Sequence, residues 1–165
     1  MAIKQMLHTT ELCNKIISII SAALKTSLNL KEIQFGGLEY LPTPTAATFA
    51  NYVPGILVKP LTIDPKFKEL GESYEMNYSF RIIFINKFSI STEVVKEKAL
   101  RIKDVAELFF DDLTLGALAL TNGTINWLMI DKIEFEPPED DFVLTFGSNL
   151  YAIALNLTIN VLTES

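Results

Sequence analysis

The sequence predicts an α+β fold, with a mixed or mainly antiparallel sheet and two helices packed on one of its faces. Two stretches have the hydrophobic period of amphipathic helices, and the stretches between and after them are rich in β-branched and aromatic residues. The last stretch alternates apolar with small or polar residues, which is typical of a strand with one face in the core. At 165 residues, the chain has the length of a single domain.

The first helix is predicted over residues 9–26. Thr9 or Thr10 can cap it, and Glu11 lies in its first turn, where a carboxylate interacts favourably with the helix dipole. Its apolar residues recur three or four positions apart and form one stripe: Cys13, Ile16, Ile17, Ile20 and Leu24. We expect this stripe to face the core.

Residues 31–62 are predicted to form a Pro/Gly-rich loop with short strands such as Ile33–Phe35 and Ile56–Lys59. Loops of this length in compact domains are usually functional or disordered. Four residues make this one too apolar for a solvated linker: Tyr40, Leu41, Phe49 and Tyr52. We expect them to pack on the chain's own sheet or on a neighbouring subunit, which makes them candidate contact residues.

A central strand is predicted over residues 72–88, after a loop or extended hairpin. One of its faces carries the even-numbered apolar residues Tyr78, Phe80, Ile82 and Phe84. Ile83 and Ile85 make the other face apolar as well. Because both faces are apolar, we expect this strand to be covered on both sides.

The second helix is predicted over residues 91–113, with Ser91 or Thr92 as its cap. Its apolar stripe comprises Val95, Ala99, Ile102, Ala106, Phe109 and Leu113, and the opposite side is charged and solvated. Asp111 and Asp112 lie at the negative end of the helix dipole, which is unfavourable. We therefore expect a Lys or Arg near them, on this chain or another, and count both as candidate contacts.

Two antiparallel strands are predicted over residues 124–136 and 142–162, the second with a break near Gly147. In the last strand, the odd-numbered residues from 151 to 161 should enter the core and leave a small, polar opposite face. Between the strands lie Glu139, Asp140 and Asp141, which could hold a hard cation loosely. A solvated turn is the favoured interpretation, and the three residues are candidate contacts.

The composition leaves little for catalysis, and we predict no catalytic, cofactor-binding or metal-binding residues. The chain has one His and one Cys. His8, the only base for a triad, lies in an N-terminal stretch expected to fray, and Cys13 lies in the apolar stripe, where a thiol is inert.

The charge and hydropathy patterns exclude two further kinds of partner. A net charge of −6 disfavours electrostatic binding of nucleic acid. The apolar run from Ile16 to Leu24 is too short to span a membrane, and we see no signal-peptide pattern, so a soluble protein is expected.

Four segments, together with the first helix and the last strand, carry a resemblance over residues 9–161. They are the Pro-punctuated segment Tyr52–Val58, the strand Tyr78–Ile85, the acidic helix end and Leu-Gly turn Ala106–Gly116, and the strand Ile130–Pro137. Their order resembles the tail-terminator and tail-completion proteins of long-tailed bacteriophages. The stretch between Lys59 and Tyr78 is longer here than in that family.

The resemblance implies a non-catalytic virion protein that assembles in the host cytoplasm into a tail or neck. Subunits of that family form homo-oligomeric rings, usually hexameric, that terminate the tail tube and join tail to head. The implied partners are the tail-tube protein and neck or connector proteins, with DNA passing through without specific binding. Two alternatives stay open: another neck or tail-tube-associated protein, and a small carboxylate-dependent enzyme using Glu136 and Asp140.

Overall fold

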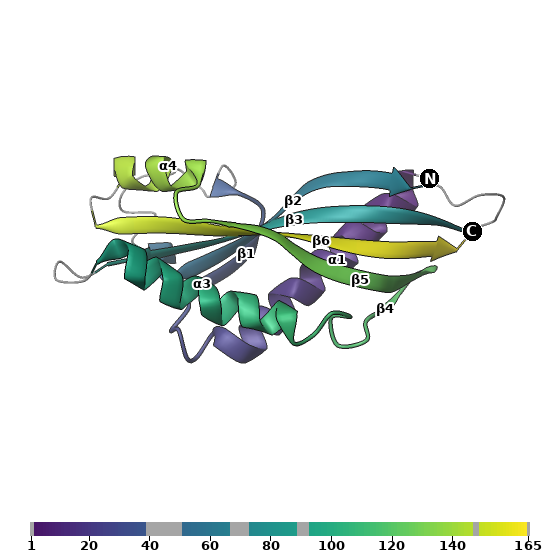
Figure 1. The fold of residues 1–165 in the computed structure, drawn as a ribbon, viewed down its shortest axis with the longest axis horizontal. Helices are drawn as coiled ribbons and strands as arrows, with labels where there is room; N and C mark the ends of the chain where they lie inside the picture. Colours follow the sequence, from purple (N-terminus) through teal and green to yellow (C-terminus); the bar gives the residue numbers. More distant parts are fainter. Residues whose placement is uncertain (1, 39–50, 67–72, 89–92, 147–148, 165) are drawn as a thin grey trace.

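The computed structural model describes residues 2–38, 51–66, 73–88, 93–146 and 149–164. Three helices and six strands occupy this part of the chain (Figure 1). In chain order they are α1 (Ala2–Leu24), β1 (Glu32–Phe35), β2 (Gly55–Lys66), β3 (Ser73–Lys87), α3 (Val94–Phe110), β4 (Ala119–Leu120), β5 (Gly123–Glu134), α4 (Pro138–Phe146) and β6 (Leu150–Glu164).

The strands form one sheet in the order β1-β2-β3-β6-β5-β4. Among the strands of the described residues, β1 and β2 pair in parallel and the other neighbours are antiparallel. The predicted fold class, α+β with a mixed sheet, is therefore confirmed. Figure 1 shows α1 and α3 on one side of the sheet and α4 on the other.

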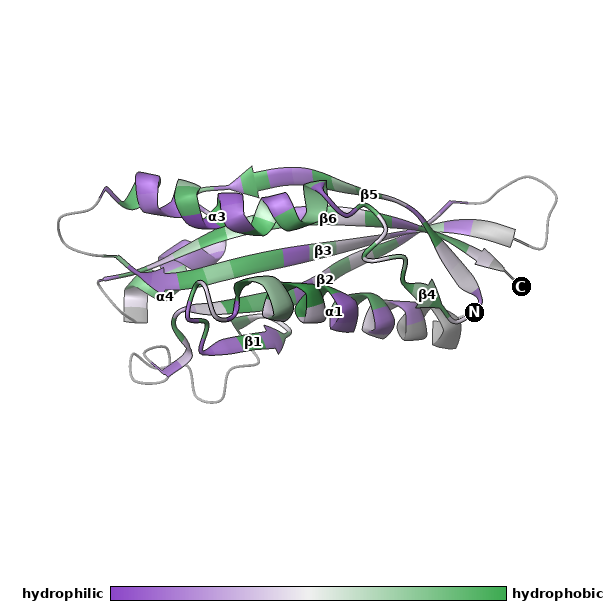
Figure 2. Cartoon of the chain, turned by 90° about the horizontal axis from the view of Figure 1, so that it is seen from below, coloured by the Kyte–Doolittle hydropathy of each residue, from purple (hydrophilic) through white to green (hydrophobic). Residues whose placement is uncertain are grey.

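The larger core lies between the sheet and the helices α1 and α3. Buried side chains of both helices belong to one cluster with the even-numbered face of β3 and the odd-numbered face of β6. The cluster includes Ile16 of α1, Phe109 of α3, Phe80 of β3 and Leu155 of β6, all fully buried. Figure 2 shows hydrophobic residues along much of β3, whereas α3 carries residues of both kinds.

A second, smaller core covers part of the opposite face. Val143 of α4 packs there with Ile83 of β3 and with Ala152 and Ala154 of β6. The prediction that β3 is covered on both sides is therefore confirmed between Ile82 and Ile85, all of which are buried. The small residues Ala152 and Ala154 allow α4 to approach the sheet closely.

The prediction for residues 137–162 is wrong in its first part. Instead of a strand from residue 142, the chain forms α4 through Phe146, and β6 begins at Leu150. Pro138 is the first residue of α4, and three carboxylates follow it in the first turn. Proline and acidic residues both favour a helix N-terminus, so the segment interpreted as a solvated turn is the start of a helix.

Strand β2 is longer than predicted. Instead of ending at Lys59, it continues to Lys66 through Pro60 and Pro65. Prolines are tolerated in an edge strand, and β1 pairs with β2 only up to Val58. The predicted loop over residues 31–62 is thus partly a sheet edge.

The first helix begins seven residues before the predicted start at Thr9. Consequently, His8 lies inside α1 and is buried, which corrects the expectation of a frayed N-terminus at this residue. Its Nε2 donates to the Thr121 carbonyl oxygen at 2.7 Å, so its Nδ1 accepts from the Tyr78 hydroxyl at 3.1 Å. The ring also lies against Gly123: a Cβ there would come within 3.1 Å of His8 and of Val161.

The buried face of α3 differs from the predicted stripe. Ile102, Ala106 and Phe109 are buried as expected, but Val95 is 64% exposed. The helix ends at Phe110 instead of the predicted residue 113, so Leu113 lies outside it. Lys98 and Val105 are buried as well. The Lys98 ammonium has hydrogen-bond partners inside the protein, which a hydrophobic pattern does not reveal.

Candidate subunit-contact surface

Strand β5 has an open outer edge. Its inner edge pairs with β6, whereas its outer edge pairs with β4 only at Gly123 and Thr124. From Ile125 to Glu134, no strand within the described ranges pairs with this side. Backbone groups along such an edge are a template for pairing with another chain.

Exposed apolar side chains accompany this edge. Trp127 and Met129 are 38% and 51% exposed, and they pair with Asn160 and Thr158 of β6, so they share the face that also bears α4. Phe135, just after the strand, is also exposed. Exposed Trp, Met and Phe are enriched in protein–protein interfaces, so this edge is a candidate contact surface.

The opposite side of the sheet has a second open edge. Beyond Val58, β2 pairs with β3 on its inner side, and no strand of the described part pairs with its outer side. Thr62, Asp64 and Lys66 are exposed along it, and the apolar Leu61 is 41% exposed. The four-stranded part of the sheet formed by β2, β3, β6 and β5 therefore has an open edge at each end.

Between these edges the sheet face away from α1 and α3 is polar. Nδ2 of Asn160 donates to Oδ1 of Asn77 at 2.6 Å, and Thr158 Oγ1 donates to Asp131 Oδ2 at 2.5 Å. Oδ1 of Asn160 is buried without a hydrogen-bond partner in the described part of the chain. The predicted small, polar face of the last strand is present here, whereas α4 covers its beginning.

A buried arginine holds α4 on this face. Arg81 of β3 is 7% exposed. Its Nε and Nη2 donate to the two carboxylate oxygens of Glu139 at 2.7 and 2.9 Å, a bidentate pair. Nη2 also donates to Glu134 at 2.8 Å, and Nη1 donates to Oδ1 of Asn156 at 2.8 Å. The guanidinium thus joins β3, β5, β6 and α4.

A second buried ion pair joins α4 to α3. The Lys98 ammonium donates to Asp140 Oδ2 at 2.8 Å and to the Phe135 carbonyl oxygen at 2.6 Å. The other carboxylate oxygen of Asp140 accepts from the Ala152 backbone N–H at 2.7 Å. Lys98 and Asp140 together therefore connect α3, the residue that follows β5, α4 and the start of β6.

The charges around Arg81 shift the pKa of its partners. Burial raises the pKa of Glu139, but hydrogen bonds from Arg81 and from its own backbone amide, with the charges of Arg81 and Lys59, bring it below the ordinary 4.5. Hydrogen bonds from Lys132 and Arg81 lower the pKa of Glu134. The hydrogen bond to Glu139 raises the pKa of Arg81. At neutral pH the cluster is therefore ionised.

Acid is expected to destabilise the fold through this cluster. A carboxyl whose pKa is lower in the folded state stabilises the fold above its unfolded pKa, and this stabilisation is lost as the pH falls through the folded value. For Glu134 and Glu139 the loss should therefore begin near pH 4.5 and continue below it. Urea unfolding from pH 7 to pH 3 measures this loss, and Arg81→Met should show a weaker dependence; equal pH dependence would contradict the assignment.

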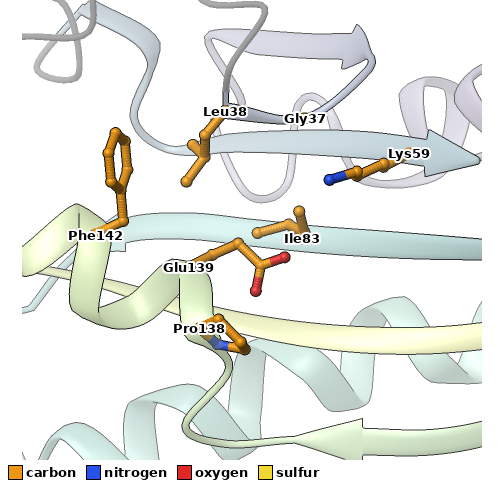
Figure 3. A pocket seen from close by; sticks show the side chains of 7 residues that line it. All are labelled: Gly37, Leu38, Lys59, Ile83, Pro138, Glu139 and Phe142. Atoms are coloured by element: carbon orange, nitrogen blue, oxygen red, sulfur yellow. The ribbon is translucent and has the colours of Figure 1, made fainter. Parts of the chain in front are cut away.

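A shallow pocket of about 270 Å³ lies beside α4. Leu38, Ile83 and Phe142 supply apolar walls, and the side chains of Lys59 and Glu139 extend into the same space from β2 and α4 (Figure 3). Glu139 is already engaged by Arg81, so the pocket has no free carboxylate at this position.

The four apolar candidates from the loop fall partly outside the described structure. Tyr40, Leu41 and Phe49 belong to residues 39–50, which are not among the described ranges. Tyr52 is described: it is half-buried and packs against the smaller core. This residue therefore contacts its own domain.

Asp111 and Asp112 lie at the end of α3. Asp111 is exposed, and Asp112 is half-buried and accepts from the backbone N–H of Thr114 at 3.3 Å. In the turn that follows, Gly116 has a φ of +69°. The Lys15 ammonium and an Asp112 carboxylate oxygen both lie within 4 Å of the place that a Gly116 Cβ would occupy. The expectation that a Lys or Arg compensates the charges of Asp111 and Asp112 remains a prediction.

The three acidic candidates of α4 have different surroundings. Glu139 and Asp140 form the buried ion pairs with Arg81 and Lys98. Asp141 is exposed, and its backbone carbonyl accepts from Thr145. Two of the three carboxylates therefore act within the chain, and only Asp141 presents its side chain to the solvent.

Sequence reasoning missed both partners of these carboxylates. Arg81 was expected in an apolar strand, and Lys98 was assigned to no face of its helix. The sequence does contain an indication that Lys98 is buried: it lies four residues from both Val94 and Ile102, on the same face of an amphipathic helix. A cation at such a position requires a buried anion, and the acidic residues of 139–141 were the available source.

Three observations concern the kinds of site that composition disfavoured. Burial raises the pKa of the Cys13 thiol to about 12, in keeping with an unreactive residue. Among the described residues, no three His, Cys, Asp or Glu side chains are grouped to hold a metal ion. None of the helices in these ranges is long and apolar enough to cross a membrane.

No family model and no curated protein matches this chain. Among solved structures, the chain is similar to one in the virion of a native gene transfer agent particle. The two sequences are 14% identical, and the superposition has a TM-score of 0.44. The similarity covers 91% of this chain and 84% of the other.

Proposed function

We propose that this chain is a non-catalytic structural protein of a phage-like virion, which forms a ring that terminates the tail tube and joins the tail to the head. The ring is a homo-oligomer, with six copies as the expected number. Its partners are the tail-tube protein on one side and neck or connector proteins on the other. The protein belongs to the tail or neck of the particle, after assembly in the host cytoplasm.

The observation that carries this proposal is the pair of open sheet edges. A monomer usually protects or covers such edges, whereas a subunit of a ring needs two different contact surfaces, one for each neighbour. Here the outer edges of β2 and β5 lie at opposite ends of the same four strands. Exposed apolar residues, Leu61 on one and Trp127 and Met129 on the other, accompany them.

The buried ion pairs support a structural role for the acidic residues of α4. Asp140 has both carboxylate oxygens occupied by Lys98 and the Ala152 N–H, and Glu139 is held by Arg81. A general acid or base needs a free oxygen within reach of a substrate. This arrangement therefore favours the structural protein over the carboxylate-dependent enzyme that would use Asp140 with Glu136.

The net charge of −6 per chain supports passage of DNA without binding. A ring of negative subunits offers phosphates few cations to replace their counterions. DNA can then move through the opening without being held by it.

Sedimentation of the purified chain, alone and with tail tubes of its own particle, tests this function. We expect either a species several times 18.5 kDa or a monomer that assembles into a closed ring at one end of each tube. Binding along the length of the tubes would indicate the alternative, a tail-tube-associated protein. A monomer that does not bind tubes would refute the proposal.

A further inference from the structure

We infer that neighbouring copies of this chain join through their sheets, with the open edge of β5 in one copy against the open edge of β2 in the next. This inference rests on the proposed ring and specifies its contact. The occupant of each edge is a second copy of the chain. The contact is heterologous, because two different surfaces meet, and repeating it around an axis can close a ring.

Each of the two edges offers a short stretch of regular pairing. In β5, the pairing with β6 is irregular between Ile125 and Trp127 and again between Ile130 and Lys132, which leaves Trp127–Ile130 as a regular stretch. In β2, the pairing with β3 is irregular between Pro60 and Thr62, and Pro65 lacks a backbone N–H group. The regular stretch of β2 is therefore Thr62–Asp64. Thr62–Asp64 can therefore pair with residues of Trp127–Ile130, and bulges or prolines limit pairing beyond these stretches.

The two stretches also lie at the same height in the sheet. One row across the four strands runs Asp64, Asn77, Asn160 and Trp127. The next row on that face runs Thr62, Ser79, Thr158 and Met129. Placing copies side by side without a shift along the strands brings Met129 of one copy opposite Thr62 of the next.

The strand directions fit this arrangement. β2 and β6 are antiparallel to β3, and β5 is antiparallel to β6, so β5 and β2 run in opposite directions. A rotation about an axis along the strands preserves these directions. The contact is then an antiparallel pair, and α1 and α3 stay on the same side of the sheet in every copy.

In this register, the like charges of Lys59 and Lys132 face each other across the contact, since both lie in the row of Arg81. Lys132 forms an ion pair with Glu134 of its own chain. This carboxylate offsets the repulsion. The exposed apolar side chains of Trp127 and Met129 supply apolar area that this contact would bury.

Disulfide trapping tests the contact with little background, because the single native cysteine, Cys13, is fully buried. Thr62→Cys and Met129→Cys are placed in two differently tagged chains, which are co-expressed and then oxidised. Both positions are exposed, so each variant should fold. Leu100→Cys, 59% exposed on α3, is the matched control, and the mass of each sample is measured before oxidation.

We expect a linked dimer when the two variants are mixed and none from either alone or from the Leu100→Cys control. A chain carrying both substitutions should give a ladder of linked species. Samples that have the mass of a ring and yet form disulfides only within a single variant, equally in the control, or not at all would overturn the proposed contact. None of these results would contradict the ring. Monomers in every sample, with and without tail tubes, would overturn the ring and with it this contact.

Discussion

Replacing Arg81 by methionine is expected to destabilise the fold by about 3–5 kcal/mol, because the change removes one partner of a buried charge cluster. The carboxylates of Glu139 and Glu134 would lose their hydrogen bonds with the guanidinium, at 2.7 to 2.9 Å, and Asn156 would lose its donor. Glu139 and Asn156 would lose these partners in a largely desolvated place, whereas Glu134 would keep its ion pair with Lys132. Chemical denaturation at pH 7 measures the change.

A surface ion pair provides the control for Arg81. Lys96 and Glu93 lie 3.4 Å apart, and their side chains are 75% and 71% exposed. Lys96→Met should change the stability by less than about 1 kcal/mol, because exposed pairs contribute little. If Arg81→Met lowered the free energy of unfolding no more than Lys96→Met does, the ion pairs of Arg81 would not hold α4 on the sheet.

Replacing Leu155 by aspartate is expected to prevent folding. Leu155 lies in the middle of β6, fully buried in the core beneath α1 and α3. A carboxylate there would have no cation or hydrogen-bond donor in the apolar cluster. Burying it unpaired should cost more than about 4 kcal/mol, which is most of the free energy of unfolding of a typical domain. Circular dichroism and solubility of the expressed chain report the result.

Leu100→Asp is the matched control for Leu155→Asp. It makes the same chemical change at a residue that is 59% exposed on α3. We expect this variant to fold with nearly unchanged stability. Equal behaviour of the two variants would mean that the orientation of β6 is incorrect.

The elements with a regular pattern were predictable, and those determined by distant partners were not. The alternation of β6 and the two apolar faces of β3 placed Leu155 and Phe80 correctly in the core. The orientation of α3 was not predictable from periodicity, because Lys98 turns inward toward Asp140, 42 residues away. Likewise, α4 depends on Arg81, which lies 58 residues before Glu139.

The candidate contact surface was predictable only in part. The small, polar face of β6 was expected from alternation and is present at Thr158 and Asn160. The open edges of β2 and β5 depend on which strands are neighbours, and a single sequence does not contain the strand order. The acidic residues 139–141 were identified as candidates, but their ion pairs with Arg81 and Lys98 were not predicted. A run of carboxylates has the same composition in a solvated turn as in a buried ion pair.

An image of the native particle by electron microscopy, with a label at the C-terminus of this chain, tests the central claim most directly. We expect a closed ring of labelled subunits at the head-proximal end of the tail tube, with the sheets of neighbouring copies side by side. A label distributed along the tube, or found on isolated single copies, would contradict it.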